Sequence, residues 1–190
     1  MITSILDEPR TAVAARDSRD KRRGRLLDPL AIALLAAVIS GIAASGPSLW
    51  FDEGATISAS ASRSLPELWR LLGHIDAVHG LFYLLMHGWF VVFPPTEFWS
   101  RVPSCLAIGA AAAGVVVFAK QFSSRTIAVC AGVVFAILPR ATWAGVEARS
   151  YAFTAIAGVW LTILLVTAIG RNRWRLWLLY AVALDRKSVV

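Results

Sequence analysis

The chain has 190 residues, of which 57% are hydrophobic and only 16% are charged. This composition excludes a single soluble domain of that length, which would carry far more polar surface. A formal net charge of +7 would suggest a nucleic-acid partner in a soluble protein, but here the basic residues cluster beside apolar runs, as they do in the cytoplasmic flanks of membrane helices. We therefore expect an all-α, polytopic transmembrane protein of the cell membrane with no nucleic-acid partner.

The first 25 residues are polar and contain a strongly basic run at 16–25. Such a segment lacks the apolar side chains needed for a packed core, so we expect a disordered basic cytoplasmic tail at 1–25. An alternative is that 1–46 is a signal peptide, because small residues follow its apolar stretch. That leader would be long, and the later apolar segments need a membrane in either case.

Asp28-Pro29 has the composition of a helix start, with Asp as the N-cap and Pro at the first helical position. It opens an apolar run that is long enough to cross a membrane. The membrane module is expected over 26–184, with a long outer loop at 47–100 that contains juxtamembrane helices. The predicted spans are about 29–46, 102–120, 126–144, 151–170 and, in part, 176–184.

The apolar run 81–93 decides the sidedness of everything that follows it. It is shorter than the ~20 residues that a spanning helix needs, and its length suits an interfacial or re-entrant helix. If it does not span, most basic residues, including those at 171–175, lie on the cytoplasmic side; if it spans, the 171–175 cluster lies outside. The positive-inside rule favours the first topology, with a cytoplasmic N-terminus and an extracytoplasmic loop at 47–100.

The last six residues, 185–190, match the translation of GAT-CGG-AAG-AGC-GTC-GTG, which is the start of a common sequencing adapter. We therefore expect the natural sequence to diverge after Leu184, within an apolar segment. Cys105 and Cys130 lie inside apolar runs, where a thiol behaves as a small hydrophobic group, and they imply no disulfide or zinc site.

The strongest chemical signal is the acid pair Asp52-Glu53, which follows the first span and is flanked by Trp50 and Phe51. A carboxylate at a water–lipid boundary can accept the proton of a hydroxyl group or hold a divalent ion beside a phosphate leaving group. The alternative is that both acids are simply solvated in a loop.

A second signal is the polar lead-in to the aromatic helix at 81–93, which contains His74, Asp76 and His79. The helix can rest at the outer interface and hold these groups beside Asp52. Imidazole and carboxylate are suitable metal ligands, but neither the spacing nor a second cluster requires a metal here.

A third signal is Glu147-Ala148-Arg149-Ser150-Tyr151 at the outer end of the 151–170 span. Arginine suits phosphate recognition because its guanidinium donates two parallel hydrogen bonds. The plainer alternative is a Glu–Arg pair at a helix end with Tyr as an interfacial anchor. Arg101, at the start of the second span, has a similar alternative, since an interfacial Arg is often only snorkelling.

Taken in order, these segments resemble the N-terminal module of the membrane glycosyltransferases of the C-type fold, in the bacterial branch similar to dolichyl-phosphate-mannose protein mannosyltransferases and lipid A aminoarabinose transferases. The resemblance covers 26–184 and lies in the order of the acid pair, the Asp/His-led aromatic helix, Arg101-Val102-Pro103-Ser104 and the Glu-Ala-Arg-Ser-Tyr-Ala run at 147–152. It implies transfer of a sugar from a polyprenyl-phosphate donor to an extracytoplasmic glycan or protein acceptor.

By the same resemblance, Asp52 is the base that activates the acceptor hydroxyl, and Glu53 orients it or binds sugar. Arg101 and Arg149 hold the donor phosphate or neighbouring carboxylates, and Tyr151 lines the donor pocket. The substrate-binding residues implied in this way are Asp76, His79, Arg101, Glu147, Arg149 and Tyr151.

The sequence departs from the family in places. Gly80-Leu81 follows His79 where relatives often have Pro-Pro-Leu, and a Gly at this place in actinobacterial members suggests a decaprenyl-phosphate donor of mannose or arabinose for a cell-envelope glycan. Glu147 has no Asp beside it where some relatives bind metal, so a divalent cation stays open and no metal ligand is assigned. We expect the chain alone to be an inactive fragment, because the module needs further spans.

Two other functions remain open. A transporter or flippase of lipid-linked sugars also places charges along a substrate path, although usually near the midplane and within inverted repeats. A non-catalytic membrane scaffold would tolerate replacement of both Asp52 and Glu53.

Overall fold

The computed structural model describes residues 8–72 and 80–187, and this part of the chain is helical, without a strand. Three helices are long and apolar enough to cross a membrane. They are α1 (Glu8–Ala44, apolar from Leu26), α5 (Glu97–Ala119) and α8 (Tyr151–Arg171). The expectation of an all-α chain with helices of membrane-spanning length is therefore confirmed for the described residues.

A fourth apolar stretch is broken into two helices. α6 (Arg125–Ile137) and α7 (Pro139–Val146) meet at Leu138 with a bend of 56°, and together they are long and apolar enough to cross a membrane. Pro139 explains the break, since its ring clashes with the preceding turn and it has no amide N–H to donate. The span predicted over 126–144 thus corresponds to a bent pair of helices.

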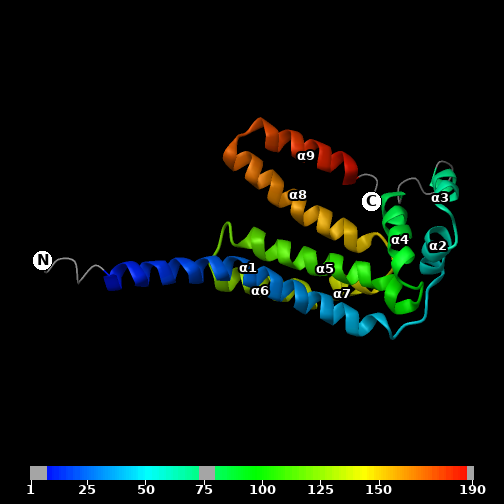
Figure 1. Cartoon of the computed structure of the whole chain (residues 1–190), viewed down its shortest axis with the longest axis horizontal. Helices are drawn as coiled ribbons and strands as arrows, with labels where there is room; N and C mark the ends of the chain where they lie inside the picture. The colour runs from blue at the N-terminus through cyan, green and yellow to red at the C-terminus, as the bar shows by residue number, and fades with distance from the viewer. Residues whose placement is uncertain (1–7, 73–79, 188–190) are drawn as a thin grey trace, which may run out of the picture.

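Shorter helices complete the chain. α2 (Phe51–Ser60), α3 (Leu65–Leu72) and α4 (Gly80–Val92) follow α1, and α9 (Trp174–Lys187) follows α8. Figure 1 shows α2, α3 and α4 gathered at one end of the bundle, on the right of the view, which we call the α2 end. α4 has the length of the short apolar run in the sequence and is shorter than a spanning helix.

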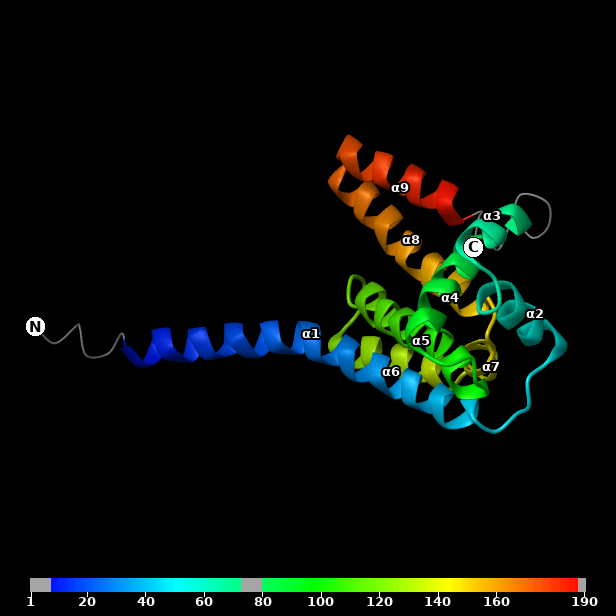
Figure 2. The same cartoon turned by 45° about the vertical axis from the view of Figure 1, so that its right-hand side comes forward.

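The centre of the bundle is the pair α1 and α5. α1 packs along α5 and also contacts α6 and α7, whereas α8 packs on the other side of α5 and carries α9 beside it (Figures 1 and 2). The contact depends on small residues: a Cβ atom added at Gly109 of α5 would lie 2.7 Å from the carbonyl oxygen of Ala33. Such close backbone approach is typical of helix pairs in membranes.

The start of α1 differs from the sequence prediction. The helix begins at Glu8 and passes through Pro29, so most of the segment 1–25, for which the sequence predicts a disordered tail, is helical in the structure. Its Ala, Arg and Lys residues have high helix propensity, which the compositional argument for disorder did not weigh. Figure 2 shows this part of α1 extending away from the other helices.

Asp28 accordingly has a different role from the predicted N-cap. Its carboxylate accepts hydrogen bonds from Lys120 at 2.8 Å and from both Nε and Nη2 of Arg125 at 2.8 and 2.7 Å. Lys120 and Arg125 flank the turn between α5 and α6, so this ion-pair cluster ties α1 to that turn. We call this side of the bundle the Asp28 end; it lies opposite the α2 end.

Candidate functional site

The acid pair lies where α1 has ended and α2 begins. Trp50 is the N-cap of α2, and its amide N–H donates to Oε2 of Glu53 at 3.1 Å. This contact satisfies one of the amide groups that the start of a helix leaves unpaired. The local sequence thus fixes Glu53 against the start of its own helix.

Glu53 is also the centre of a buried ion pair with Arg101 of α5. Arg101 donates from Nε to Oε1 at 2.8 Å and from Nη2 to Oε2 at 2.7 Å, and each side chain is only 1% exposed. The amide of Ala148, in the connection between α7 and α8, donates to Oε1 at 2.8 Å. Burial alone would raise the pKa of Glu53, but the hydrogen bonds from Arg101, Ala148 and Trp50 outweigh it and hold this pKa below its ordinary value.

The remaining donors of Arg101 are also occupied. Nη1 donates to the carbonyl oxygens of Ala44 at 2.7 Å and Pro47 at 2.8 Å, and Nη2 donates to that of Ser48 at 3.1 Å. Ala44 is the last residue of α1, whose final carbonyls have no partner within the helix. Arg101 therefore ties the end of α1 and the loop after it to α5, and no N–H of its guanidinium is left free for a phosphate.

Asp52 has the opposite environment. It is 63% exposed, and its Oδ2 lies 3.5 Å from Nη2 of Arg149, which is itself 22% exposed. At this distance the two form an ion pair rather than a short hydrogen bond. Asp52 is thus the carboxylate of the pair that a ligand can reach, and it is held beside a cation.

Glu147 lies close to the same group. It is the C-cap residue of α7 and is partly buried. Burial raises the pKa of Glu147 above its ordinary value, and the negative charges of Glu53 and Asp52 act in the same direction, whereas Arg149 and Arg140 oppose it. The structure therefore brings Asp52, Glu147 and Arg149 together, and their roles in binding or catalysis stay predictions.

An aromatic stack lies next to these charges. The rings of Trp143 and Tyr151 are stacked with centroids 5.7 Å apart, and the guanidinium of Arg140 lies over Trp143, 4.6 Å from its ring centroid. The sequence argument named Tyr151 but missed Trp143 and Arg140. Their spacing of three residues, directly after the helix-breaking Pro139, was the available signal, because it places both side chains on one face of a helix.

The aromatic helix α4 packs against α2. The buried residues of their contact come from α2, α3 and α4 and are Ala59, Leu68, Phe82, Tyr83 and Met86. Nδ1 of His87 lies 2.8 Å from the carbonyl oxygen of Ser60 at the end of α2, so this histidine has a backbone partner. The predicted site residues Asp76 and His79, together with His74, lie outside the described residues.

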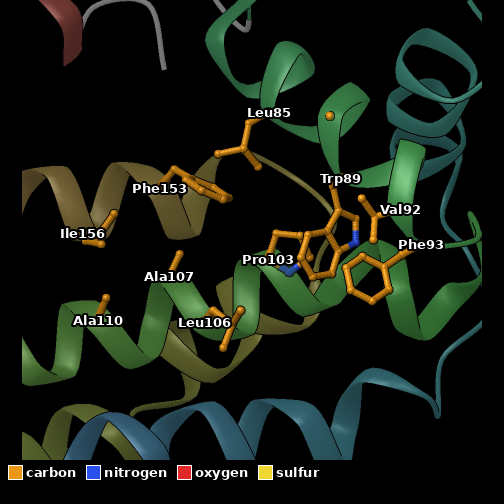
Figure 3. Close-up of a pocket in the computed structure, with 11 residues that line it drawn as sticks. Leu85, Trp89, Val92, Phe93, Pro103, Leu106, Ala107, Ala110, Phe153 and Ile156 are labelled. Atoms are coloured by element: carbon orange, nitrogen blue, oxygen red, sulfur yellow. The ribbon is translucent and has the colours of Figure 1, made fainter. Parts of the chain in front are cut away.

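An apolar groove runs between α4, α5 and α8, as Figure 3 shows. Its volume is about 590 Å³, and its lining side chains are hydrophobic, among them Leu85, Trp89, Leu106 and Phe153. Trp89 stacks on Phe93 with centroids 4.1 Å apart and forms one wall of the groove. A groove of this composition suits a hydrocarbon chain.

No cluster of three or more His, Cys, Asp or Glu side chains suited to a metal occurs within 26–72 and 80–185. Glu53 is already saturated with protein donors, whereas Asp52 and Glu147 lie beside it and are more accessible to a cation. Whether a divalent cation binds there stays a prediction.

No protein-family model matches this chain, and neither the curated proteins nor the solved structures include a match to it. The resemblance noted from its motifs and the geometry of the α2 end are therefore the basis of a functional proposal.

Proposed function

We propose that this chain belongs to a membrane glycosyltransferase that transfers a sugar from a polyprenyl-phosphate donor to a hydroxyl group of an acceptor. The observation that carries the proposal is the exposed carboxylate of Asp52, which lies 3.5 Å from Arg149 and directly beside the buried Glu53–Arg101 pair. A base and a cation held side by side on a rigid support are the minimum that this reaction needs.

In the proposed reaction, the acceptor oxygen attacks the anomeric carbon of the donor and the bond from that carbon to the phosphate oxygen breaks. Asp52 takes the acceptor proton, and the phosphate leaves with the bonding electron pair. Attack opposite the leaving group inverts the anomeric configuration. Arg149 compensates the negative charge that grows on the phosphate.

The buried pair has a supporting role in this mechanism. Glu53 and Arg101 satisfy each other and the backbone at the end of α1, so they position Asp52 rather than contact the substrate. The resemblance implied that Glu53 either orients Asp52 or binds sugar, and that Arg101 holds the donor phosphate or neighbouring carboxylates. We keep the orienting role for Glu53, and we assign phosphate binding to arginines other than Arg101.

The apolar groove between α4, α5 and α8 fits the isoprenoid tail of such a donor. Its lining side chains are hydrophobic, and a tail bound there would remain continuous with the surrounding lipid. In this arrangement the α2 end faces the extracytoplasmic side and the Asp28 end faces the cytoplasm, in a multi-pass protein of the cell membrane. The resemblance favours mannose or arabinose as the sugar and a cell-envelope glycan or a protein as the acceptor.

The direct test is Asp52→Asn in the full-length protein, assayed for sugar transfer from a polyprenyl-phosphate sugar. Loss of a general base should lower turnover by about 10²- to 10⁴-fold. Glu67→Gln, on the exposed surface of α3, is the matched control and should leave turnover unchanged. Unchanged turnover in Asp52→Asn would remove Asp52 from the mechanism.

A transporter or flippase of lipid-linked sugars is a second candidate, because the break between α6 and α7 resembles the discontinuous helices of transporter binding sites. Purified protein in vesicles distinguishes the two. Movement of a labelled polyprenyl-phosphate sugar across the bilayer, with no transfer to any acceptor, would favour the transporter.

A further inference from the structure

Arg140 is a charged residue in an unusual position. It follows Pro139 directly, at the break between α6 and α7, and it is exposed. In the part of the chain that the structure describes, its guanidinium forms no hydrogen bond or salt bridge, and its contact is with the face of the Trp143 ring at 4.6 Å. Arg101, Arg125 and Arg149, by contrast, each lie beside a carboxylate.

An arginine in such a place requires compensation. If α6 and α7 form one span, Arg140 lies within it, and cationic side chains inside spans are rare, face a polar cavity or pair with an anion, and mark functional sites. The contact with Trp143 supplies part of this compensation through the ring quadrupole. It also leaves the N–H groups at the edge of the guanidinium free to donate.

The surroundings of Arg140 connect it with the proposed active site. Trp143 is 42% exposed and stacks on Tyr151, which is 43% exposed and lies two residues after Arg149. Arg140 lies over one ring of this aromatic pair, Arg149 shortly precedes the other in the sequence, and both act electrostatically on Glu147. The face formed by these residues contains two cations, an accessible aromatic surface and the neighbouring carboxylate of Asp52.

The neighbouring side chains suit a ligand that arrives from the lipid phase. Ile137 is 60% exposed and Leu138 is 43% exposed, and both immediately precede the break at Pro139. A soluble anion would have to approach across this apolar surface, whereas the headgroup of a lipid already lies at the membrane boundary. The combination of exposed apolar residues, a stacked guanidinium and a second cation nearby favours a phosphate carried by a lipid.

We propose that Arg140, held over Trp143, binds the phosphate group of the polyprenyl-phosphate donor and retains it when the group becomes a polyprenyl monophosphate after transfer. The proposal rests on the proposed function, which supplies the donor class. In the absence of a free guanidinium on Arg101, Arg140 and Arg149 together provide the two positive charges that match a phosphate monoester. Trp143 and Tyr151 are then positioning residues that fix the guanidinium plane.

The test is lipid binding by the 190-residue chain in detergent micelles, measured by native mass spectrometry. The probes are a polyprenyl monophosphate, the corresponding polyprenol without phosphate, phosphatidylglycerol and inorganic phosphate. Arg140→Gln should weaken binding of the polyprenyl monophosphate about tenfold or more, because it removes hydrogen bonds to a charged group. Arg140→Lys, which keeps the charge but loses the planar fork, should give an intermediate loss.

The chain contains a matched control. Arg175 is also exposed and lies 5.8 Å from the ring centroid of Trp174, but it belongs to α9, which the proposed function does not involve. Arg175→Gln should leave binding unchanged. Thermal unfolding of each variant accompanies the binding measurement, and the Lys variant provides the test if the Gln variant does not fold.

Three results would overturn the inference. The first is unchanged affinity for the polyprenyl monophosphate in both Arg140 variants, and the second is an equally large loss of affinity for the polyprenol that has no phosphate. The third is displacement of bound polyprenyl monophosphate by an equal concentration of phosphatidylglycerol or inorganic phosphate. The proposed function fails separately. Asp52→Asn should retain lipid binding while it lowers transfer by about 10²- to 10⁴-fold. Unchanged transfer in Asp52→Asn therefore overturns the reaction, whereas unchanged binding in Arg140→Gln and Arg140→Lys overturns only the phosphate site.

Discussion

Asp52 and Glu53 are neighbours in the chain, yet 63% of the first side chain and only 1% of the second is exposed. The difference arises because Glu53 is the third residue of α2 and points back toward Trp50 and Arg101, whereas Asp52 points away from that contact. A buried carboxylate must be paired, and Glu53 is paired at both oxygens. One acid therefore stabilises the fold, and the other is available for chemistry.

We predict that Glu53→Gln strongly destabilises the protein. It leaves the buried guanidinium of Arg101 without its counter-charge, and removal of one partner from a buried ion pair costs about 3–5 kcal/mol. The free energy of unfolding, measured by denaturant titration in mixed micelles, checks this value. Asp52→Asn is the matched control, since an exposed substitution should change that free energy by less than about 0.5 kcal/mol. Equal effects of the two variants would contradict the assignment of separate roles.

Glu147 gives a prediction about pH. Burial and the nearby charge of Glu53 raise its pKa above the ordinary value of 4.5. The folded state therefore binds this proton more tightly than the unfolded state, so the stabilisation is complete below about pH 4.5 and is lost as the pH rises through the higher folded value. Glu147→Gln stays neutral and escapes this loss, so its stability relative to the parent should increase with pH.

Glu67→Gln is the control of opposite sign for this measurement. Hydrogen bonds from the hydroxyl and amide of Ser64 lower the pKa of Glu67, so its stabilisation is present above the ordinary pKa and is lost in acid. Relative to the parent, Glu67→Gln should become less stable as the pH rises. Thermal unfolding of both variants and of the parent is measured between pH 4 and 8. If the stability of Glu147→Gln and that of the parent change in parallel with pH, the pKa of Glu147 is not raised.

At the level of helices, the bundle depends on close approach of α1 and α5. A Cβ atom at Gly109 would lie 2.7 Å from a backbone oxygen of α1, and backbone cannot move aside as a flexible side chain can. We predict that Gly109→Ala costs about 1–3 kcal/mol of stability, as overpacking of a tight contact typically does. Gly158→Ala in α8 is the control, since nothing lies within 4 Å of a Cβ there. Unfolding in mixed micelles measures both, and a neutral Gly109→Ala would show that the helices are further apart.

The sequence predicted the helices well where hydrophobicity alone determines them. The apolar part of α1, α5 and α8 lie close to the predicted spans, because a run of about 20 apolar residues has few other stable arrangements. The start of α1 was missed because Pro29 and Asp28 have the composition of a helix start, whereas the helix passes through them and Asp28 pairs with Lys120 and Arg125. Those partners lie more than 90 residues later in the chain, so no local pattern reveals them.

For the whole molecule, ion pairs secure both ends of the central helices. At the Asp28 end a carboxylate of α1 joins the turn between α5 and α6, and at the α2 end Arg101 of α5 joins the end of α1. The sequence pointed to Asp52, Glu147, Arg149 and Tyr151 at one end of the bundle, which the structure brings together. It did not reveal that Arg101 is saturated or that Arg140 lies over Trp143, since both depend on how the helices pack.

The opposite placement of these two ends leads to a prediction of sidedness. If the α2 end is extracytoplasmic, a cysteine at position 52 should react with a membrane-impermeant maleimide in intact cells, because Asp52 is exposed. A cysteine at Phe122, which is 66% exposed in the turn between α5 and α6, should react only after the membrane is permeabilised. Both cysteine substitutions are introduced into a protein that also carries Cys105→Ala and Cys130→Ala, so that neither native thiol reacts with the maleimide. Labelling at position 122 and protection at position 52 would place the carboxylates on the cytoplasmic side, where no extracytoplasmic acceptor is within reach, and the proposed transfer would then fail together with the topology.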